Sequence, residues 1–322
     1  MRKFFLRIPV ILLCFMVLAQ SVSAAKLLIP GGQIIGLELQ NETVTVAAFD
    51  TSLGDTAKSA GLQVGDRILK VDKTTVTCPD DVRLALTRSK GTVKLQIERQ
   101  QEKKQITLTP AITEDGPRLG VYLKQGISGI GTVTFYDPET GTFGALGHGV
   151  CAQGKDLSPI RQGSAFDASI VSVKKGKSGT PGQLIGSIRS EKQIGSVAKN
   201  SHQGVFGTLT LPVDGAAIPT AAAAEIHTGS ATIRSTVSGS TPREYSVEIL
   251  KIYAASRDGG RNMLLKVTDP DLLATTGGIV QGMSGSPIIQ DGKLIGAVTH
   301  VLVHDPTTGY GIFIENMLDA AA

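Results

Sequence analysis

Ser284 stands in a short loop whose residue types suit nucleophilic chemistry. The loop spans residues 282–287 and reads GMSGSP. A serine between glycines on a tight turn can present its hydroxyl and the adjacent backbone N–H groups to a substrate carbonyl, as acyl transfer requires. Glycine permits the strained turn and leaves space for a scissile bond. Glycine and serine also dominate ordinary turns, so the loop by itself leaves a simple hairpin turn open.

The Gly-x-Ser-Gly-x-Pro pattern, followed by apolar residues and then Gly292, resembles the nucleophile loop of chymotrypsin-like serine peptidases. By that resemblance Ser284, rather than Ser286, is the attacking residue. We expect the backbone N–H groups of Gly282 and Ser284 to form the oxyanion hole, because they flank the point where negative charge develops.

His148 is the leading candidate for the general base. It follows two expected strands in the stretch 131–150, which surround an Asp-Pro-Glu-Thr-Gly turn at 137–141. A lone histidine between glycines is often only a turn residue, but the nucleophile motif 136 residues later makes it a candidate base. The order of histidine before serine matches chymotrypsin-like peptidases rather than α/β-hydrolases, in which the serine comes first.

A charged partner must orient His148. Asp269 precedes Ser284 by 15 residues, and a bend at its Asp-Pro pair can bring the carboxylate beside the nucleophile loop. Asp271 competes for this role on sequence grounds, as does Asp305 more distantly. The alternative is that Asp269 caps a short helix whose first residue is the following proline.

The remaining histidines predict no metal site. His202 and His227 stand in polar surroundings without a partner pattern. His300 and His304 have a four-residue spacing that can ligate metal on a helix. The β-branched run between them predicts a strand instead, where positions four apart lie about 13 Å from each other. We therefore expect neither a metal nor another cofactor.

The composition favours antiparallel β structure. The 322 residues are 41% hydrophobic, which suggests about two domains with sizeable cores. There are 38 glycines, few aromatic residues and many short Val/Ile/Thr segments, so the fold class is predicted to be mainly β. A formal charge of +4, without a long basic run or an aromatic platform, argues against nucleic-acid binding.

Residues 1–24 predict an export signal. Arg2 and Lys3 precede an apolar run at 10–19, and small residues at 22–24 offer a cleavage site. The mature chain is expected to begin near Ala25. An uncleaved membrane anchor is the alternative, although the apolar run is short for one.

Residues 31–110 show a second set of motifs. The segment 59–72 places a glycine turn before an alternating strand, the signals at 79–91 predict a helix, and 93–108 predict a closing hairpin. This pattern resembles the PDZ family. The resemblance implies a loop, Ile35-Gly36-Leu37, whose N–H groups bind a peptide's terminal carboxylate while the peptide adds a strand to the sheet. A structural PDZ domain without a ligand is the alternative.

The polar, turn-rich run at 113–118 is interpreted as the start of a second domain, which covers residues 111–322. The histidine-to-serine order and the alternating strands predict a chymotrypsin-like double β-barrel, with the site in the cleft between its halves. Cys78 and Cys151 fall in different predicted domains, so thiols are expected rather than a disulfide.

The whole pattern resembles the SpoIVB peptidases of endospore formers. The resemblance is carried by the signal segment, one PDZ domain, the Leu-Gly-His-Gly histidine, the Thr-Asp-Pro-Asp segment and the stretch from 277 to 310. It implies a catalytic triad of His148, Asp269 and Ser284. The preference for Asp269 over Asp271 rests on this resemblance.

The resemblance also implies an exported signalling protease that acts between two membranes of the developing spore. It would cleave itself and a membrane-associated regulatory protein, and so activate an intramembrane protease that processes a sigma factor. Further implied partners are a peptide or protein substrate, a second copy bound through the PDZ domain, and a protein inhibitor. The alternatives are a catalytically inactive PDZ scaffold and a secreted β-rich binding protein.

Overall fold

The computed structural model describes residues 25–322, except 152–156, 159, 161, 211–213 and 255–258. The predicted export signal, residues 1–24, lies outside the described residues. Within the described chain, no helix has the length and apolar character needed to cross a membrane. Cys78 and Cys151 form no disulfide, as predicted.

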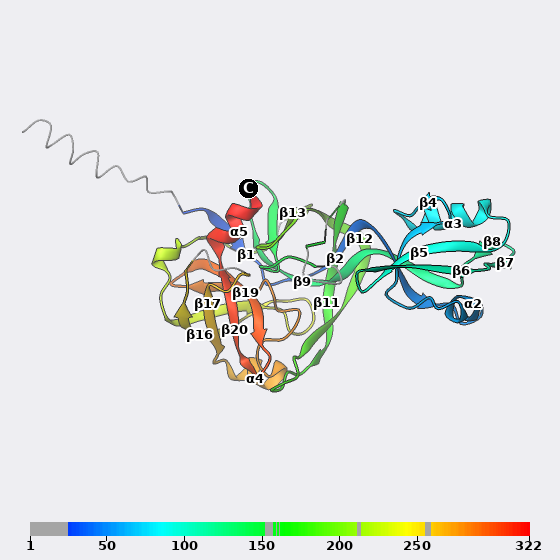
Figure 1. The fold of residues 1–322 in the computed structure, drawn as a ribbon. Coiled ribbons are helices and arrows are strands. Elements are labelled where there is room, and N and C mark those ends of the chain that lie inside the picture. The colour runs from blue at the N-terminus through cyan, green and yellow to red at the C-terminus, as the bar shows by residue number, and fades with distance from the viewer. Residues whose placement is uncertain (1–24, 152–156, 159, 161, 211–213, 255–258) are drawn as a thin grey trace, which may run out of the picture.

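One hydrophobic cluster holds together a PDZ unit, which lies to the right in Figure 1. Alternate residues of its strands are buried, as the period of a half-buried strand requires: Val93, Leu95 and Ile97 are all fully enclosed. The unit contains the second half of β2 (Ile34–Phe49), α2 (Asp55–Ser59), β3 (Arg67–Val71), β4 (Thr74–Thr75), α3 (Pro79–Arg88), β5 (Val93–Arg99), β6 (Glu102–Leu108), β7 (Ala111–Thr113) and β8 (Gly116–Arg118).

Helix α3 begins where the sequence predicts it. Pro79 occupies the first helical position, where its missing N–H costs nothing. The Asp81 carboxylate accepts hydrogen bonds from the backbone N–H groups of Thr77 at 2.8 Å and Cys78 at 3.1 Å. These bonds favour the charged carboxylate and lower the pKa of Asp81. The apolar face of the helix covers the core of the PDZ unit through Val82, Ala85 and Leu86.

Six strands of the peptidase domain form a first closed ring. Each strand pairs with its neighbour around the ring, and the last strand pairs again with the first. The predicted turn between the first two strands is present, because the Gly141 N–H donates to the Asp137 carbonyl at 2.9 Å. In order around the ring the strands are β9 (Val121–Tyr136), β10 (Thr142–Ala145), β13 (Gly204–Leu209), β12 (Gln183–Ser201), β11 (Gln162–Lys174) and the first half of β2.

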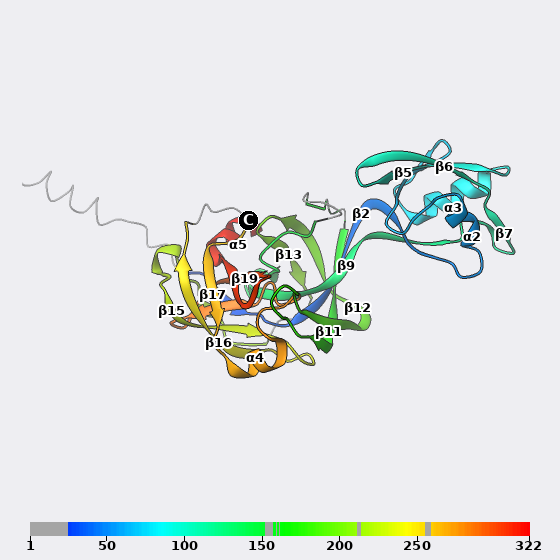
Figure 2. The same ribbon diagram turned by 60° about the horizontal axis from the view of Figure 1, so that its bottom comes forward.

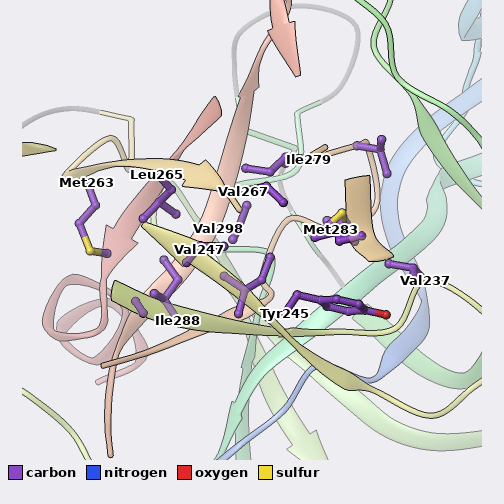
Figure 3. Packing of buried hydrophobic residues seen from close by; sticks show 14 of the residues in the cluster. Val237, Tyr245, Val247, Met263, Leu265, Val267, Ile279, Met283, Ile288 and Val298 are labelled. Atoms are coloured by element: carbon purple, nitrogen blue, oxygen red, sulfur yellow. The ribbon is translucent and has the colours of Figure 1, made fainter. Parts of the chain in front are cut away.

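The remaining strands form a second closed barrel, whose apolar core is seen in Figure 3. Helix α4 (Pro270–Thr276) lies between two of its strands in the sequence, and α5 (Ile314–Ala321) ends the chain. Short elements connect the two rings: β1 (Leu27–Pro30), β14 (Ile218–Pro219) and the 3-10 helix η1 (Ala223–Glu225). The barrel strands in spatial order are β15 (Gly229–Ser235), β16 (Arg243–Ile252), β17 (Met263–Val267), β20 (Asp305–Phe313), β19 (Lys293–Leu302) and β18 (Pro287–Gln290).

Two long strands join the PDZ unit to the first ring. Strands β2 and β9 each run for 16 residues, and they pair with each other both in the ring and in the PDZ unit. The ladder shifts register between Leu39 and Val44, where the strands pass from one unit to the other. Figures 1 and 2 both show this two-stranded connection.

The predicted boundary between residues 110 and 111 does not coincide with the division of the cores. The polar run that suggested a linker forms the β7–β8 hairpin, which belongs to the PDZ unit together with Leu119. Conversely, residues 34–39 belong to the first ring. The predicted class is nevertheless confirmed: the chain is mainly β, with a PDZ unit and a peptidase domain of two barrels.

Candidate active site

The loop that carries Ser284 is fixed between the two barrels. Gly282 and Gly285 have φ values of 99° and 95°, a region that favours glycine. Their carbonyl oxygens accept hydrogen bonds from the first ring, from the Thr132 hydroxyl at 2.7 Å and the Thr134 hydroxyl at 2.8 Å. The loop therefore lies where both barrels meet.

Met283 anchors the same loop from the other side. Its side chain is fully buried and packs in the core of the second barrel, where Figure 3 shows it. Because Met283 points inward, the neighbouring Ser284 faces away from this core and is only half-buried. The loop is thus held by an apolar anchor on one barrel and by hydrogen bonds from the other.

The two serines of the loop have different surroundings. Ser286 is fully buried, and its hydroxyl donates to the Ser235 hydroxyl at 2.9 Å. The Ser284 hydroxyl donates to the Thr299 carbonyl oxygen at 2.8 Å. A substrate carbonyl can reach the half-buried Ser284, whereas Ser286 is enclosed by the protein. The surroundings therefore favour Ser284 as the nucleophile.

Backbone N–H groups of the loop divide into two sets. Those of Met283, Gly285 and Ser286 donate to backbone carbonyl oxygens at 2.7 to 3.1 Å. The N–H groups of Gly282 and Ser284 make no hydrogen bond to any residue that the structure describes. These are the two donors predicted for the oxyanion hole.

His148 lies just beyond β10, after two residues with positive φ, Leu146 and Gly147. Its Nδ1 is 3.0 Å from the carbonyl oxygen of Gly149. A carbonyl can only accept, so Nδ1 carries the proton of the neutral ring and Nε2 keeps its lone pair. Burial lowers the pKa of His148, and the Gly149 carbonyl offsets only part of that effect. The imidazole is thus neutral at neutral pH, in the tautomer that a general base requires.

Strand β19 brings the two residues into one site. Thr299 accepts the Ser284 hydroxyl, and a Cβ on Gly147, next to His148, would lie 2.9 Å from the Thr299 side chain. The following residue, His300, has its ring centre 5.5 Å from that of His148. The nucleophile from one barrel and the histidine from the other therefore lie beside two consecutive residues of β19, Thr299 and His300.

Asp269 is engaged elsewhere. It is the N-cap of α4, and its carboxylate accepts from the backbone N–H groups of Leu272 at 3.0 Å and Ser246 at 3.3 Å. No contact between Asp269 and His148 is found among the described residues. These hydrogen bonds are those of the alternative, in which Asp269 caps a helix. They do not support its predicted role as the carboxylate that orients His148.

The course of β17 explains this separation. Leu264 pairs with Tyr310, which in turn pairs with His300, so Leu264 lies at the level of the candidate site. From there to Val267 the strand advances roughly 10 Å at 3.3 Å per residue, and Asp269 follows only after the strand has ended. Of the two competing carboxylates, Asp271 is exposed, and Asp305 accepts from the hydroxyls of its own turn.

His300 is a site residue that the sequence interpretation considered only as a metal ligand. Its Nδ1 is buried and has no hydrogen-bond partner in the described chain. An unsatisfied buried polar group of this kind costs about 1–3 kcal/mol. Burial, together with the positive charges that His148 and Arg261 can carry, lowers the pKa of His300 to about 4. No local pattern in the sequence marks this residue, because His148 lies far from it in the chain.

The predicted carboxylate-binding loop of the PDZ domain is corrected by the structure. Ile35, Gly36 and Leu37 lie inside β2, and this part of β2 pairs with β9 on one side and with β11 on the other. The side chains of Ile35 and Leu37 are buried, and a Cβ on Gly36 would lie 2.8 Å from Ile188. Because both strand edges are occupied, these residues cannot receive a peptide carboxylate.

In the PDZ unit, strand β9 lies between β2 and α3, beside the helix. Residues 121–125 pair with 44–49 of β2, and β9 contacts α3. The Gln125 side chain donates to the Thr77 carbonyl oxygen at 3.0 Å, next to the start of that helix. One of the strands beside α3 is therefore supplied by the chain that returns to the peptidase domain.

Comparison with known families agrees with these observations. The SpoIVB peptidase S55 family matches residues 115–318, and the PDZ domain family matches residues 34–109. No curated protein matches the chain. The first match covers more than half of the chain, and its region contains the second barrel, the first ring apart from β2, and the two loops that carry Ser284 and His148. The chain belongs to the SpoIVB peptidase S55 family.

Proposed function

We propose that this PDZ-containing peptidase is an exported serine endopeptidase with Ser284 as nucleophile and His148 as general base. The observation that carries the proposal is the convergence of Ser284 and His148, from separate barrels, on Thr299 and His300. Membership of a serine peptidase family supports the same reaction class.

The reaction follows from these groups. The Ser284 hydroxyl oxygen bonds to the scissile carbonyl carbon while its proton passes to Nε2 of His148. The N–H groups of Gly282 and Ser284 stabilise the resulting oxyanion. The imidazolium then gives its proton to the leaving amine as the peptide C–N bond breaks, which leaves an acyl-enzyme. Water then attacks the acyl carbon while His148 takes its proton. The bond between that carbon and the Ser284 oxygen breaks, His148 returns the proton to this oxygen, and the acid product leaves.

Ser284 must turn before it attacks. Its hydroxyl donates to the Thr299 carbonyl, so its proton points at a backbone acceptor rather than at His148. Rotation about the Cα–Cβ bond moves the oxygen between staggered positions without moving the loop. Substrate binding can drive this rotation, because a peptide carbonyl would bond to the two N–H groups on either side.

The physiological role that we propose is regulated proteolysis during sporulation. The enzyme would act outside the cytoplasm, between the membranes of the developing spore, on itself and on a membrane-associated regulatory protein. Cleavage of that regulator would activate an intramembrane protease that processes a sigma factor. Family membership and the predicted signal segment at 1–24 support this role.

An inactive PDZ scaffold is the second candidate. The observation in its favour is that Ser284, His148 and Asp269 each hydrogen-bond to backbone groups rather than to one another. A scaffold with this arrangement would bind peptides without reacting with a carbonyl or its analogues.

A serine-reactive phosphonate probe separates the two candidates. The full chain, Ser284→Ala and Ser286→Ala are incubated with the probe, and the adduct is located by mass spectrometry of the digested protein. We expect an adduct on Ser284 in the wild type and in Ser286→Ala, and none in Ser284→Ala. An unlabelled wild type would favour the scaffold, and an adduct on Ser286 would move the nucleophile by two residues.

A further inference from the structure

Gly282 provides one of the predicted oxyanion donors, and the peptide units on both sides of it are anchored to the first ring. A trans peptide unit is planar, so a hydrogen bond to its carbonyl oxygen also fixes the direction of its N–H. The unit that carries the Gly282 N–H has the Gln281 carbonyl at its other end, which accepts from the Leu184 N–H at 2.8 Å. In the next unit, the Gly282 carbonyl accepts from the Thr132 hydroxyl at 2.7 Å. Because glycine has no side chain to limit rotation, these two bonds fix the orientation of the donor.

Ser284 provides the other donor, and two hydrogen bonds in series hold its peptide unit. The Met283 carbonyl, at the other end of that unit, accepts from the Ser286 N–H at 3.0 Å. The unit that carries the Ser286 N–H begins with the Gly285 carbonyl, which accepts from the Thr134 hydroxyl at 2.8 Å. Hydrogen bonds in such a series polarise and strengthen one another. Thr134 therefore supports the second donor from β9, the strand that also supports the first.

Thr132 also contacts the turn that carries the general base. Its carbonyl oxygen accepts from the Leu146 N–H at 3.1 Å, two residues before His148. The hydroxyl and the carbonyl of one residue thus bind the nucleophile loop and the histidine turn at the same time. The strand beneath them is itself paired, since Thr132 lies opposite Ile34 of β2. This support matters because a misplacement of about 1 Å between reacting groups can cost about 100-fold in rate.

Packing alone does not explain a threonine at position 132 or 134. Both side chains are fully buried. Valine has nearly the same shape, is equally suited to a strand and brings no hydroxyl that must be satisfied. The two hydroxyls instead meet the carbonyl groups of the two glycines on either side of Ser284. Their contribution is therefore to the nucleophile loop.

We propose that Thr132 and Thr134 are positioning residues of the peptidase site, which hold the two oxyanion donors in place through the carbonyl groups of Gly282 and Gly285. Thr132 in addition fixes the nucleophile loop relative to the turn of His148. Both threonines act through the loop rather than on the substrate. This inference rests on the proposed peptidase function.

Four variants of the full chain test whether these hydroxyls set the reaction rate. Thr132→Val and Thr134→Val each remove one hydroxyl and keep the shape of the side chain, while Thr132→Ser keeps the hydroxyl. Thr236→Val is the matched control: Thr236 is also fully buried, and its hydroxyl donates to the carbonyl of Gly32 at 2.8 Å, outside the nucleophile loop. Circular dichroism and thermal unfolding check that each variant is folded. The maximal rate constant of phosphonate labelling and the half-saturating probe concentration are measured for each.

The phosphoryl oxygen of the probe gains negative charge where the substrate oxyanion would form, so the labelling step depends on both donors. We expect Thr132→Val and Thr134→Val to lower the maximal labelling rate by about 10-fold or more, with the half-saturating concentration nearly unchanged. Thr132→Ser should recover most of the rate. Thr236→Val should label like the wild type, although it loses a comparable buried hydrogen bond.

Wild-type labelling of the valine variants would overturn the inference and leave the proposed function in place. An equal loss of rate in Thr236→Val, or a change in half-saturating concentration alone, would also overturn it, because neither result is specific to the labelling step. A Thr132→Ser variant as slow as Thr132→Val would assign the effect to the methyl group. Each valine variant is a test by itself, so the other still decides if one does not fold. A wild type that is not labelled at all would overturn the proposed function, and this inference with it.

Discussion

Ser284 and Ser286 stand in one loop but have different surroundings and different proposed roles. Ser284 faces the junction of the barrels, whereas Ser286 holds Ser235 inside the protein. In many glycine- and serine-rich turns the serine hydroxyls neither face a site nor hydrogen-bond inside the protein. Here burial and the hydrogen-bond partners distinguish the two serines, and they lead to opposite expectations for Ser284→Ala and Ser286→Ala.

Ser286→Ala should destabilise the fold without removing the nucleophile. It leaves the buried Ser235 hydroxyl without its partner, which costs about 1–3 kcal/mol in free energy of unfolding. Urea unfolding measures this cost. The control is Ser235→Ala combined with Ser286→Ala, which removes both hydroxyls and should recover part of the loss. A single variant as stable as the wild type would contradict the assignment.

The rate of phosphonate labelling should have its acid limb below the ordinary histidine pKa of about 6.5. Burial lowers the pKa of His148, so a larger fraction of the ring is neutral at a given pH than in an exposed histidine. The limb is measured from labelling rates between pH 4 and pH 8 on the folded protein. A midpoint above the ordinary value would show that a carboxylate acts on His148.

Among single residues, the sequence predicted the nucleophile and the general base better than the groups that hold them in place. The glycine pattern around Ser284 and the order of histidine before serine are direct consequences of the chemistry, so they are visible in the chain. An Asp-Pro pair is equally suited to orient a histidine and to begin a helix. No residue pattern near Asp269 distinguishes these two roles. His300 carries no local signal because its neighbour, His148, is 152 residues away.

The nucleophile loop depends on the close approach of two elements. Gly285 has φ of 95°, and a Cβ there would lie 2.2 Å from the Thr132 carbonyl oxygen of β9. This contact is between backbone atoms, so a flexible side chain cannot relieve it. The loop can therefore approach β9 this closely only because residue 285 has no side chain.

Gly285→Ala should abolish labelling and lower the free energy of unfolding by about 3 kcal/mol or more, the range of a strained and overpacked site. Gly292→Ala is the matched control. Gly292 also has a positive φ, 75°, but a Cβ there meets nothing within 4 Å. That variant should lose only about 1–2 kcal/mol and label normally. Similar behaviour of both variants in unfolding and labelling would contradict the proposed contact with β9.

Strand β2 shows why the PDZ loop was misplaced. A hydrophobic-Gly-hydrophobic run reads the same in a loop that binds a carboxylate and in a strand buried on both sides. Sequence alternation reports which face of a strand is apolar, but it does not report whether its edges are paired. The pairing with β11, which begins more than 100 residues later, decides the matter.

On the scale of the whole molecule, the PDZ unit is an insertion in a hairpin of the first ring. Leu39 of β2 pairs with Ile127 of β9, and residues 40–126 leave and return at that point. Neither end of the PDZ unit is a linker. The predicted division into 31–110 and 111–322 follows the order of the chain, whereas the structure divides it at a pair of neighbouring strands.

Replacing residues 40–126 by an Asn-Gly turn should give a folded peptidase domain. Leu39 and Ile127 are directly opposite, and a two-residue turn of this type joins such a pair with the correct twist. The variant should be monomeric in gel filtration, unfold cooperatively and label on Ser284. The contrasting variant, residues 111–322 alone, lacks β2 and should not fold, because β9 and β11 lose the strand between them.

The paired ends of the PDZ unit also bear on the order of folding. For the first ring, residues 40–126 are one long loop, and the entropy of closing it opposes the pairing of Leu39 with Ile127. The PDZ unit has its own core, and its formation already brings Val44 beside Gln125. Once it has folded, the loop is closed, and the two strands enter the ring in register. We therefore expect the PDZ unit to fold first and to set the rate at which the peptidase barrel forms.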